Sequence, residues 1–378
     1  MSNILLYGGG LQVLSIARSL KESGHNVYVA NDENVIIKHC RYVDSYVVLQ
    51  NADVDGLLNQ VHLWGIDVII PMEDKWAEEL SVNRTIIENQ TTAKCAVCDI
   101  NIFRLASDKT SLLNFCKLHN LPHPKTAIID NNIDNTIEYV GFPSVVKPSH
   151  SEGARGIVLV NSKEELCSIV SSHVQQYGEC SLQEYIENDH YYNVMLYRCA
   201  DGTYANHVVT NISRYYPIKG GSSSLCTTIE NTKLVDICKQ VLDKLGWIGF
   251  ADFDVLEKQN DDYRIIEINP RVPASVRAAA ISGVNFGNII VSDILTGCIP
   301  SYKYEPGKQL RYLGLDVAWF LSSPMRFKAN PSWFKFFGKN IYYQEGGVKD
   351  WKAMLASIFS GIKKMISPSF RRQKSGMN

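Results

Sequence analysis

The sequence has no run of apolar residues reaching about eighteen, the length that would suggest a bilayer-spanning helix. Its first residues, Met-Ser-Asn-Ile-Leu-Leu-Tyr, lack the basic segment and the apolar stretch of a signal peptide. Internal repeats and low-complexity segments are also missing. We therefore expect no membrane-spanning helix, no secretory leader and no repeat fold.

The cysteines are not arranged for a metal or redox centre. Of the ten, only Cys95 and Cys98 stand close together, and no second pair or histidine cluster follows at zinc spacing. We expect the thiols to be small, mostly buried hydrophobic side chains. Free thiols in this number are typical of a reducing compartment, so the sequence predicts a cytoplasmic protein.

Neither sign of charge is in overall excess. The 378 residues carry a net charge of −1, which gives no indication of a nucleic-acid partner. The charge is unevenly spread, because residues 301–378 contain fourteen Lys and Arg but only four Asp and Glu. This C-terminal basic extension, 301–378, indicates a surface that meets something anionic.

The chain begins with a strand–turn–helix–strand pattern. Residues 4–7 and 27–30 read as buried parallel strands joined by a helix over 11–24. The glycines at 8–10 form the turn, and they do not complete a G-x-G-x-x-G motif. We prefer a tight turn to a phosphate site. Residues 1–98 are thus predicted to form a doubly wound α/β domain.

The middle of the chain reads as an α+β unit in which strands alternate with helices and loops. Its predicted elements are strands at 143–147, 157–160 and 180–185 with a helix at 162–172. The elements predicted after it are hairpins at 191–212 and 249–269, a polar mobile loop at 213–225 and a helix at 273–296.

The second hairpin carries side chains suited to a metal. Side chains alternate faces along a strand, so Asp252 and Asp254 share one face, as do Glu267 and Asn269. Grouped oxygen atoms of this kind are the ligands that Mg²⁺ prefers. A solvated hairpin face is the alternative, although carboxylates among apolar neighbours need a reason. Arg271 follows directly and offers a guanidinium fork to a phosphate.

Two lysines precede this hairpin. Lys147 ends a buried strand, and the backbone amides of the loop that follows, with Gly153 and Gly156, are able to wrap phosphates. The loop is not a P-loop, because G-x-x-x-x-G-K-[ST] and its helix are missing. Lys109 opens a helix, where a merely solvated lysine is the alternative. The strand end at 183–186 is either an adenine-binding backbone segment or a hinge.

Together and in this order, these segments resemble the ATP-grasp superfamily. The motifs are Asp-Lys at 108–109, Val-Val-Lys-Pro with a glycine loop at 145–156, Gln-Glu-Tyr-Ile at 183–186 and Glu-Ile-Asn-Pro-Arg at 267–271. The resemblance covers nearly all of 1–297. It implies a Rossmann-like pre-ATP-grasp domain over 1–98 and a two-part ATP-grasp domain over 99–300, with a small ATP-lid part at about 115–185.

The resemblance also implies roles for individual residues. Lys109 and Lys147 resemble the lysines that contact the ATP phosphates, and Arg271 resembles the arginine that steadies the transferred phosphate. The implied magnesium ligands are Asp254, Glu267 and Asn269, with Asp252 in reserve. The other implied ATP contacts are Ser151, Gly153, Gly156, Gln183, Glu184, Tyr185, Ile186 and His190. His190 stands where many members carry a ribose-binding Glu.

Within the superfamily, residues 269–277 are similar to the carboxylate–amine ligases of the D-aspartate-ligase-like and carbamoyl-phosphate-synthase-like group. This similarity implies that ATP phosphorylates a carboxylate to an acyl phosphate. An amine then forms an amide or peptide bond, with release of ADP and phosphate. The implied cofactors are ATP and Mg²⁺, as two ions, with Mn²⁺ as an alternative. The implied substrates are a small carboxylate and an amino-acid-like amine, met by Ser275, Arg277, Gly220, Gly221 and the catalytic Arg214.

Two other functions remain open. The first alternative to the ligase is a carboxylase or carbamoyl-phosphate-like enzyme that activates bicarbonate. The second is a non-catalytic ATP-binding protein associated with a membrane. Residues 351–362 bear on the second, because they read as an amphipathic helix among basic residues. This helix either lies on a membrane surface, which would make the protein peripheral, or packs on the enzyme core, which we favour. A homo-oligomer is compatible with both.

Overall fold

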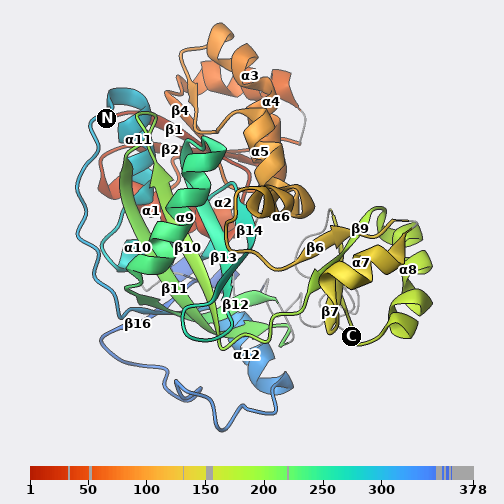
Figure 1. Cartoon of the computed structure of the whole chain (residues 1–378). Helices are drawn as coiled ribbons and strands as arrows, with labels where there is room; N and C mark the ends of the chain where they lie inside the picture. The colour runs from red at the N-terminus through yellow and green to blue at the C-terminus, as the bar shows by residue number, and fades with distance from the viewer. Residues whose placement is uncertain are drawn as a thin grey trace.

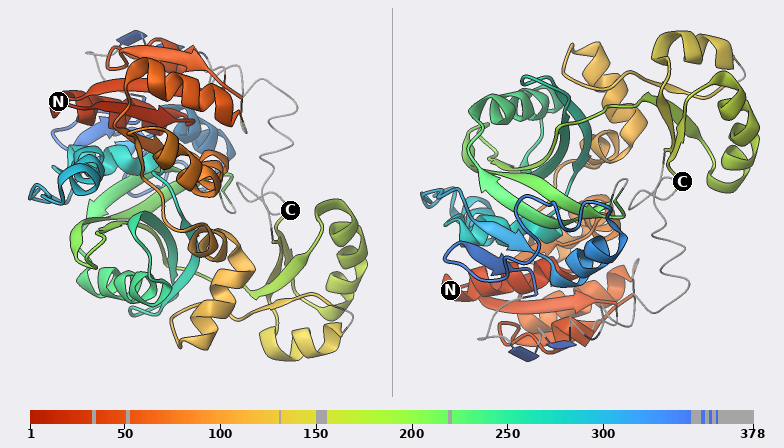
Figure 2. Two further views of the ribbon diagram at one scale, coloured as in Figure 1. Left: turned by 90° about the horizontal axis from the view of Figure 1, so that it is seen from above. Right: turned by 90° about the horizontal axis from the view of Figure 1, so that it is seen from below.

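The computed structural model describes residues 1–378 except 33–34, 51–52, 131, 150–155, 219–220, 346–350, 353–354, 357–358 and 360–378. Within these residues, a five-stranded, a four-stranded and a seven-stranded sheet organise the chain. The four-stranded sheet lies in a small lobe set apart from the rest, as Figure 1 and both views of Figure 2 show. The predicted combination of α/β and α+β folds is confirmed.

The N-terminal sheet has the strand order β3-β2-β1-β4-β5, and all its neighbouring strands are parallel. Parallel strands need crossover connections, which the intervening helices supply. The predicted strand–helix–strand unit is confirmed as β1, α1 and β2. The bounds are β1 Asn3–Tyr7, α1 Leu11–Glu22, β2 Asn26–Asn31, α2 Val35–Lys38, β3 Ser45–Val48, α3 Val54–Trp64, β4 Val68–Pro71, α4 Asp74–Gln90 and β5 Lys94–Cys95.

The glycines between β1 and α1 form a tight turn, as the sequence indicated. The φ angle of Gly9 is 101°, and a Cβ atom there would lie 2.5 Å from Cβ of Met72. Only glycine fits such a position. The buried Asn31 donates its side-chain N–H to the carbonyl oxygen of Gly9 at 2.6 Å. The side chains of Asn31 and Met72 therefore occupy the space around this turn.

The small lobe consists of a four-stranded antiparallel sheet, order β6-β9-β7-β8, packed against α7 and α8. Its own hydrophobic cluster includes Val146, Leu166 and Leu182. Helices α5 and α6 link the lobe to the N-terminal sheet. The bounds are α5 Ile100–Ser107, α6 Lys109–Leu118, β6 Thr126–Ile128, α7 Ile133–Val140, β7 Ser144–Pro148, β8 Val158–Val160, α8 Lys163–Tyr177 and β9 Cys180–Glu184.

The large sheet has the order β14-β13-β10-β11-β12-β15-β16. Both predicted hairpins are confirmed, because β10 pairs with β11 and β13 pairs with β14 in antiparallel fashion. The bounds are β10 His190–Arg198, β11 Tyr204–Tyr216, β12 Ser222–Ile229, α9 Thr232–Leu245, β13 Gly249–Glu257, β14 Tyr263–Asn269, η1 Ala274–Val276 (a 3-10 helix), α10 Arg277–Ile281, α11 Phe286–Thr296, β15 Gln309–Arg311, α12 Leu313–Ser322 and β16 Ile341–Tyr343.

Two predicted elements differ from the structure. The segment 213–225, predicted as a loop, instead continues β11 and begins β12, which β15 covers on its other side. That distant pairing partner cannot be read from local composition. The single helix predicted over 273–296 is broken, since Gly283 takes a φ angle of 91° between α10 and α11.

The basic extension contributes two short strands to the large sheet. Strands β15 and β16 both lie within 301–378 and extend the sheet beyond β12. The predicted helix at 351–362 is helical at its described positions, 351–352, 355–356 and 359. Trp351 and Phe359 are exposed there, so the packing on the enzyme core that we favoured is wrong for these side chains.

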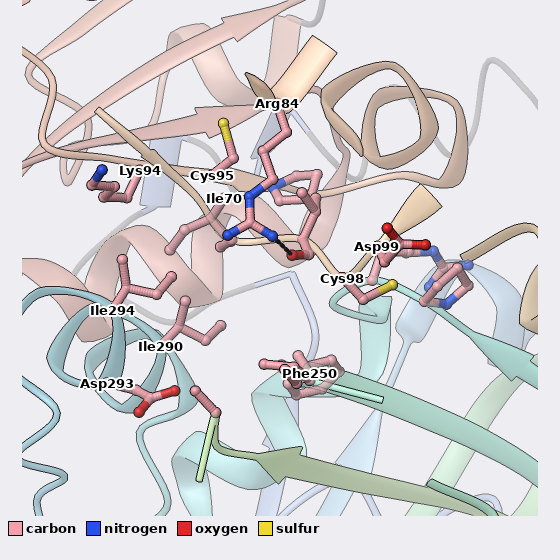
Figure 3. A pocket seen from close by; sticks show the side chains of 18 of the residues that line it. Ile70, Arg84, Lys94, Cys95, Cys98, Asp99, Phe250, Ile290, Asp293 and Ile294 are labelled. Atoms are coloured by element: carbon pink, nitrogen blue, oxygen red, sulfur yellow. Dashed lines mark hydrogen bonds between the residues drawn. The ribbon is translucent and has the colours of Figure 1, made fainter. Parts of the chain in front are cut away.

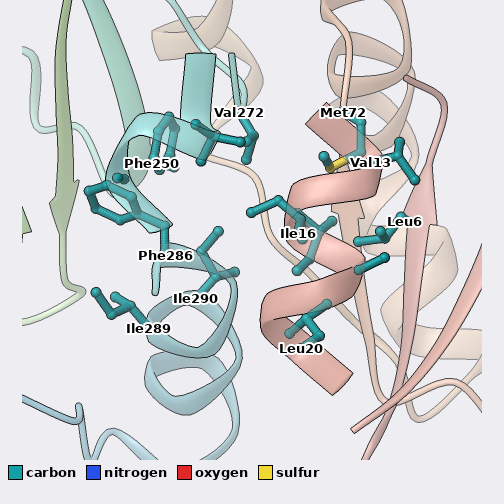
Figure 4. Close-up of a cluster of buried hydrophobic side chains, with 14 of the residues drawn as sticks. Leu6, Val13, Ile16, Leu20, Met72, Phe250, Val272, Phe286, Ile289 and Ile290 are labelled. Atoms are coloured by element: carbon teal, nitrogen blue, oxygen red, sulfur yellow. The ribbon is translucent and has the colours of Figure 1, made fainter. Parts of the chain in front are cut away.

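The largest hydrophobic cluster joins two units of the protein. One is the N-terminal unit, built on the five-stranded sheet, and the other is the large-sheet unit, built on the seven-stranded sheet. Figure 4 shows Ile16 and Leu20 of α1 facing Phe286 and Ile290 of α11, all buried. No single described helix has both the length and the apolarity for a membrane span. The pair Ala274–Ile281 and Phe286–Thr296 meets those two measures together, with a bend of 91°. Its apolar side chains belong to this cluster.

Candidate active site

Four polar side chains of the β13–β14 hairpin face one another across the strand pair. Asp252 lies opposite Asn269, and Asp254 lies opposite Glu267. The Asn269 amide nitrogen is 3.4 Å from Oδ2 of Asp252. The structure therefore brings together all four side chains that strand alternation grouped.

Two residues of the adjoining strand β10 complete this group, and the sequence analysis missed both. Asn193 stands opposite Asp254 and donates its side-chain N–H to the Asp254 carboxylate. The hydroxyl of Tyr191 also hydrogen-bonds Asp254. Tyr191 and Asn193 are two positions apart, so they share a face of β10. That spacing is a signal the sequence contained.

Burial and charge give the three carboxyl groups different pKa values. Burial raises the pKa of Asp252 to about 8, and burial with repulsion from Glu267 raises that of Asp254 well above its usual range. Burial also disfavours the charged form of Glu267, but Lys109 and the hydrogen bond with Asp254 bring its pKa down to about 2. The hairpin thus holds one firmly ionised carboxylate beside two that a nearby cation would ionise.

Two lysines reach this carboxylate group from other elements. Lys109, in the first turn of α6, places Nζ 3.2 Å from Oε2 of Glu267. Burial opposes its charge, but Glu267 outweighs burial and raises the pKa of Lys109. Lys147 comes from β7 of the small lobe, and burial lowers its pKa to about 8 despite the attraction of Glu267. Both ammonium groups therefore act on the same carboxylate.

Arg271 links the hairpin to the N-terminal unit. Its Nε is 3.3 Å from Oδ1 of Asp74, and its Nη2 is 3.3 Å from Oδ1 of Asn269. Burial alone would lower the pKa of Arg271, but Asp74 and Asp252 keep it raised. Asp74 begins α4, almost two hundred residues away in sequence, so no local motif indicated it.

The donor set fits a divalent cation. Among the described residues, no group of three or more His, Cys, Asp and Glu side chains is placed to hold a metal ion unaided. The predicted set instead includes the amide oxygen of Asn269. Oδ1 of Asp252 is buried without a hydrogen-bond partner, and Asp254 and Glu267 would repel each other if both were ionised. A hard cation with oxygen ligands would relieve both conditions.

The predicted adenine segment lies where the small lobe joins the large sheet. Gln183 is buried at the end region of β9, and its Nε2 has no hydrogen-bond partner. Ile186 is also buried. Glu184 accepts a backbone N–H at 3.1 Å, and the N–H of Tyr185 donates to a backbone carbonyl at 3.1 Å. An unpartnered buried amide beside a fixed backbone suits a ligand with hydrogen-bonding edges.

The remaining predicted ATP contacts are only partly described. Gly156 has a φ angle of 74°, and a Cβ atom there would lie 2.8 Å from Pro148. Ser151 and Gly153 lie outside the described residues. His190 begins β10 with an exposed side chain, and its Nδ1 is 3.4 Å from the side-chain nitrogen of Asn211.

The predicted substrate residues divide between two places. Ser275 and Arg277 lie in η1 and at the start of α10, and the buried Arg277 interacts electrostatically with Glu345. Gly221 precedes β12, and a Cβ atom there would lie 2.4 Å from the Tyr216 carbonyl group. Gly220 lies outside the described residues.

The guanidinium group of Arg214 is hydrogen-bonded to the C-terminal extension. It is buried in β11 and makes two hydrogen bonds to Asp316, with Nε–Oδ1 at 2.7 Å and Nη2–Oδ2 at 3.2 Å. Its Nη1 donates to the carbonyl oxygen of Pro331 at 2.8 Å. All three nitrogens thus have acceptors within the protein, which favours a structural role for Arg214, and its predicted catalytic role stays a prediction.

A separate cavity of about 380 Å³ lies between the N-terminal unit and the large-sheet unit, bordered by the Pro270–Val272 segment. Figure 3 shows Arg84, Asp293 and the two thiols Cys95 and Cys98 around it. Burial raises the pKa of each of these thiols to about 12, which makes them unreactive. Of the predicted ATP-site residues that the structure describes, only Arg271 borders this cavity.

Comparison with known proteins gives independent information on this arrangement. The family of the ATP-grasp domain matches residues 106–275. The chain is 22% identical to a D-aspartate ligase of Enterococcus faecium over 326 residues, covering 76% of each chain. Its fold is similar to Campylobacter jejuni biotin carboxylase (TM-score 0.67, 16% identity, 80% of this chain and 73% of that one). It is also similar to a Staphylococcus aureus N5-carboxyaminoimidazole synthetase solved with ADP (TM-score 0.67, 16% identity, 80% of each chain).

Proposed function

We propose that this chain is an ATP-dependent carboxylate–amine ligase of the ATP-grasp superfamily, whose domain model matches residues 106–275. It phosphorylates a carboxylate to an acyl phosphate and joins it to an amine, releasing ADP and phosphate. The observation that carries the proposal is that Lys109, Lys147 and Arg271 all interact with the carboxylates of the β13–β14 hairpin, Lys109 by an ion pair with Glu267. These groups come from different elements, and their charges suit one triphosphate.

The reaction needs charge neutralisation more than a side-chain nucleophile. A carboxylate oxygen of the substrate attacks the γ-phosphorus of ATP, and the bond to ADP breaks. The amine nitrogen then attacks the carbonyl carbon, phosphate leaves with the former carboxylate oxygen, and the amine loses a proton. Lys109 and Lys147 neutralise the phosphate oxygens, while Arg271 steadies the phosphoryl group that moves.

Asp254, Glu267 and Asn269 would hold Mg²⁺, with Asp252 in reserve. The bound ion would neutralise phosphate oxygens and position them in line for transfer. We propose two ions, with Mn²⁺ as an alternative. The raised pKa of Asp254 supports this assignment, because burial and the charge of Glu267 disfavour its ionised form and a bound cation would favour it.

The nucleotide and substrate contacts are also part of the proposal. The backbone at Glu184–Ile186 and the side chain of Gln183 would bind adenine, His190 would lie near the ribose, and Ser151, Gly153 and Gly156 would cover the phosphates. Arg277 would grip the substrate carboxylate, with Ser275, Gly220 and Gly221 beside it. The relative named as a D-aspartate ligase favours an amino acid as one substrate. All ten cysteines are free thiols, which supports a cytoplasmic location.

The test is a screen for ADP release across amino acids, in pairs of one carboxylate donor and one amine. The proposal expects ADP release that needs both partners and a product whose mass equals donor plus amine minus water. Bicarbonate with an amine serves as the second arm, since it would reveal a carboxylase. ADP release with bicarbonate alone, or no release with any pair, would rule out the ligase.

A further inference from the structure

The end of α12 and the chain that follows it expose large apolar side chains in one region. Phe327, Phe334 and Phe337 are exposed by 73%, 58% and 89%, and Leu321 and Met325 by 64% and 53%. Single exposed apolar side chains are common on proteins and need no explanation. Five within seventeen residues form a patch, and such patches mark interaction surfaces.

The aromatic rings of this region are in contact with one another. Phe327 and Phe334 stack with centroids 6.3 Å apart, and both rings contact Phe320, at 5.6 Å and 5.7 Å. Trp333 stacks on Phe320 from the protein side, at 4.1 Å. The exposed rings of Phe327 and Phe334 therefore form a continuous apolar surface with Phe320.

A buried network fixes this surface to the large sheet. Asp316 accepts hydrogen bonds from Arg214 of β11 and from Arg311 of β15, the latter at 2.5 Å. Arg311 donates to the Trp333 carbonyl oxygen at 2.7 Å, and the indole N–H of Trp333 donates to the Asp316 carbonyl oxygen at 3.0 Å. The aromatic segment is thus held in a defined conformation before any partner binds.

The same segment is positively charged, because its sequence contains no acidic residues that would balance its Lys and Arg side chains. Between Asp316 and Glu345 there is no Asp or Glu, but there are four cations: Arg326, Lys328, Lys335 and Lys339. Residues 346–378 add seven Lys and Arg against one Asp. Phenyl rings suit the boundary between headgroups and acyl chains, while long cationic side chains reach the headgroup phosphates.

We propose that this aromatic–basic face, made of the five exposed apolar residues and these four cations, binds the surface of a membrane that contains anionic lipids. In Figure 1 α12, which begins this segment, lies at the lower end of the molecule, away from α3 and β4. Docking there would hold the enzyme on the membrane while the N-terminal unit stays in solution. Phenyl rings without a polar tip favour a lipid surface over a nucleic acid or an acidic protein.

The test is vesicle flotation of the full-length protein, without nucleotide or substrate, so that it does not depend on the proposed activity. The vesicles are phosphatidylcholine alone or mixed with phosphatidylglycerol. The wild-type protein should float only with the mixed vesicles, and added salt should weaken binding. Loss of each cation should lower the partition coefficient about fivefold. The variant F327S/F334S/F337S should lose flotation, whereas L63S/L118S, with equally exposed apolar residues elsewhere, should keep it.

Three outcomes would overturn the proposal. One is the absence of wild-type flotation with anionic vesicles. Another is flotation that persists in F327S/F334S/F337S when circular dichroism shows this variant to be folded. The third is binding to a polyanion such as heparin, or a dimer that this variant disrupts, without vesicle binding. The last result would assign the face to an anionic macromolecule or to a second copy of the chain.

Discussion

Asp254 and Glu267 are direct cross-strand partners, yet their pKa values shift in opposite directions. The difference arises because Lys109 forms an ion pair with Glu267 and lowers the pKa of that carboxyl group, while burial and the charge of Glu267 raise the pKa of Asp254. A cation bound beside Asp254 would lower its pKa again. The pair is thereby set to respond to bound metal, and neutralising Glu267 would disturb both lysines as well.

Replacing Glu267 by Gln should abolish ATP turnover while the fold is retained. The side chain keeps its size, but Lys109 and Lys147 lose the charge that holds them, and a metal ligand is weakened. We expect kcat/KM for ATP to fall by about a hundredfold or more. The measurement is ADP release with the substrate pair that supports turnover.

Glu164→Gln is the matched control, because Glu164 is an exposed residue in the first turn of α8. It should keep the wild-type rate. Wild-type rates of ADP release from Glu267→Gln would remove this residue from the active site, and circular dichroism of both variants would separate loss of chemistry from loss of folding.

Lys147 predicts a pH dependence of ATP binding. Its pKa of about 8 means that the free enzyme loses this positive charge as the pH rises through that value. Since the phosphates need the charged form, KM for ATP should rise above this pH, by roughly tenfold per pH unit in the limit. In Lys147→Arg the guanidinium stays charged, so the rise should disappear even if the rate is lower. The same pH profile in both proteins would show that another group is responsible.

Asp252 predicts that stability depends on pH and on metal. Its pKa is about 8 in the folded protein but about 4 in an unfolded chain, so the folded state binds more protons between these values. The stabilisation is complete below the unfolded value and is lost as the pH rises, at up to about 1.4 kcal/mol per pH unit.

Urea denaturation of the wild-type protein and of Asp252→Asn would measure this effect. Between about pH 6 and 8 the free energy of unfolding should fall more steeply for the wild type, because only it has the group that releases a proton. Added Mg²⁺ should reduce the wild-type slope. Equal slopes in the two proteins, or no effect of Mg²⁺, would contradict the assignment.

The sequence predicted correctly those features of the fold that depend on one element or on elements adjacent in sequence. Alternation along two strands grouped Asp252, Asp254, Glu267 and Asn269 correctly, because faces of a strand follow from a period of two. The hairpins and the first strand–helix–strand unit could also be predicted, because the strands that pair in them are neighbours in sequence.

What could not be predicted depends on distant partners. Asp74 pairs with Arg271 across the interface of two units, and β15 covers β12 from the C-terminal extension. Neither contact leaves a trace in local composition. Tyr191 and Asn193 are intermediate, since their spacing was visible but their role depends on the pairing of β10 with β13.

Arg214 provides the clearest test of such a distant contact. Replacement by Ala would leave Asp316, which is fully buried, with fewer donors, and removal of one partner from a buried ion pair costs about 3–5 kcal/mol. Urea denaturation should show this loss, while kcat/KM of the folded protein changes little. The control is Lys233→Ala, since its pair with Asp261 is more than half exposed on both sides and should contribute about 0–1 kcal/mol. Arg214→Ala that kept its stability but lost turnover would contradict the structural role and support the predicted catalytic one.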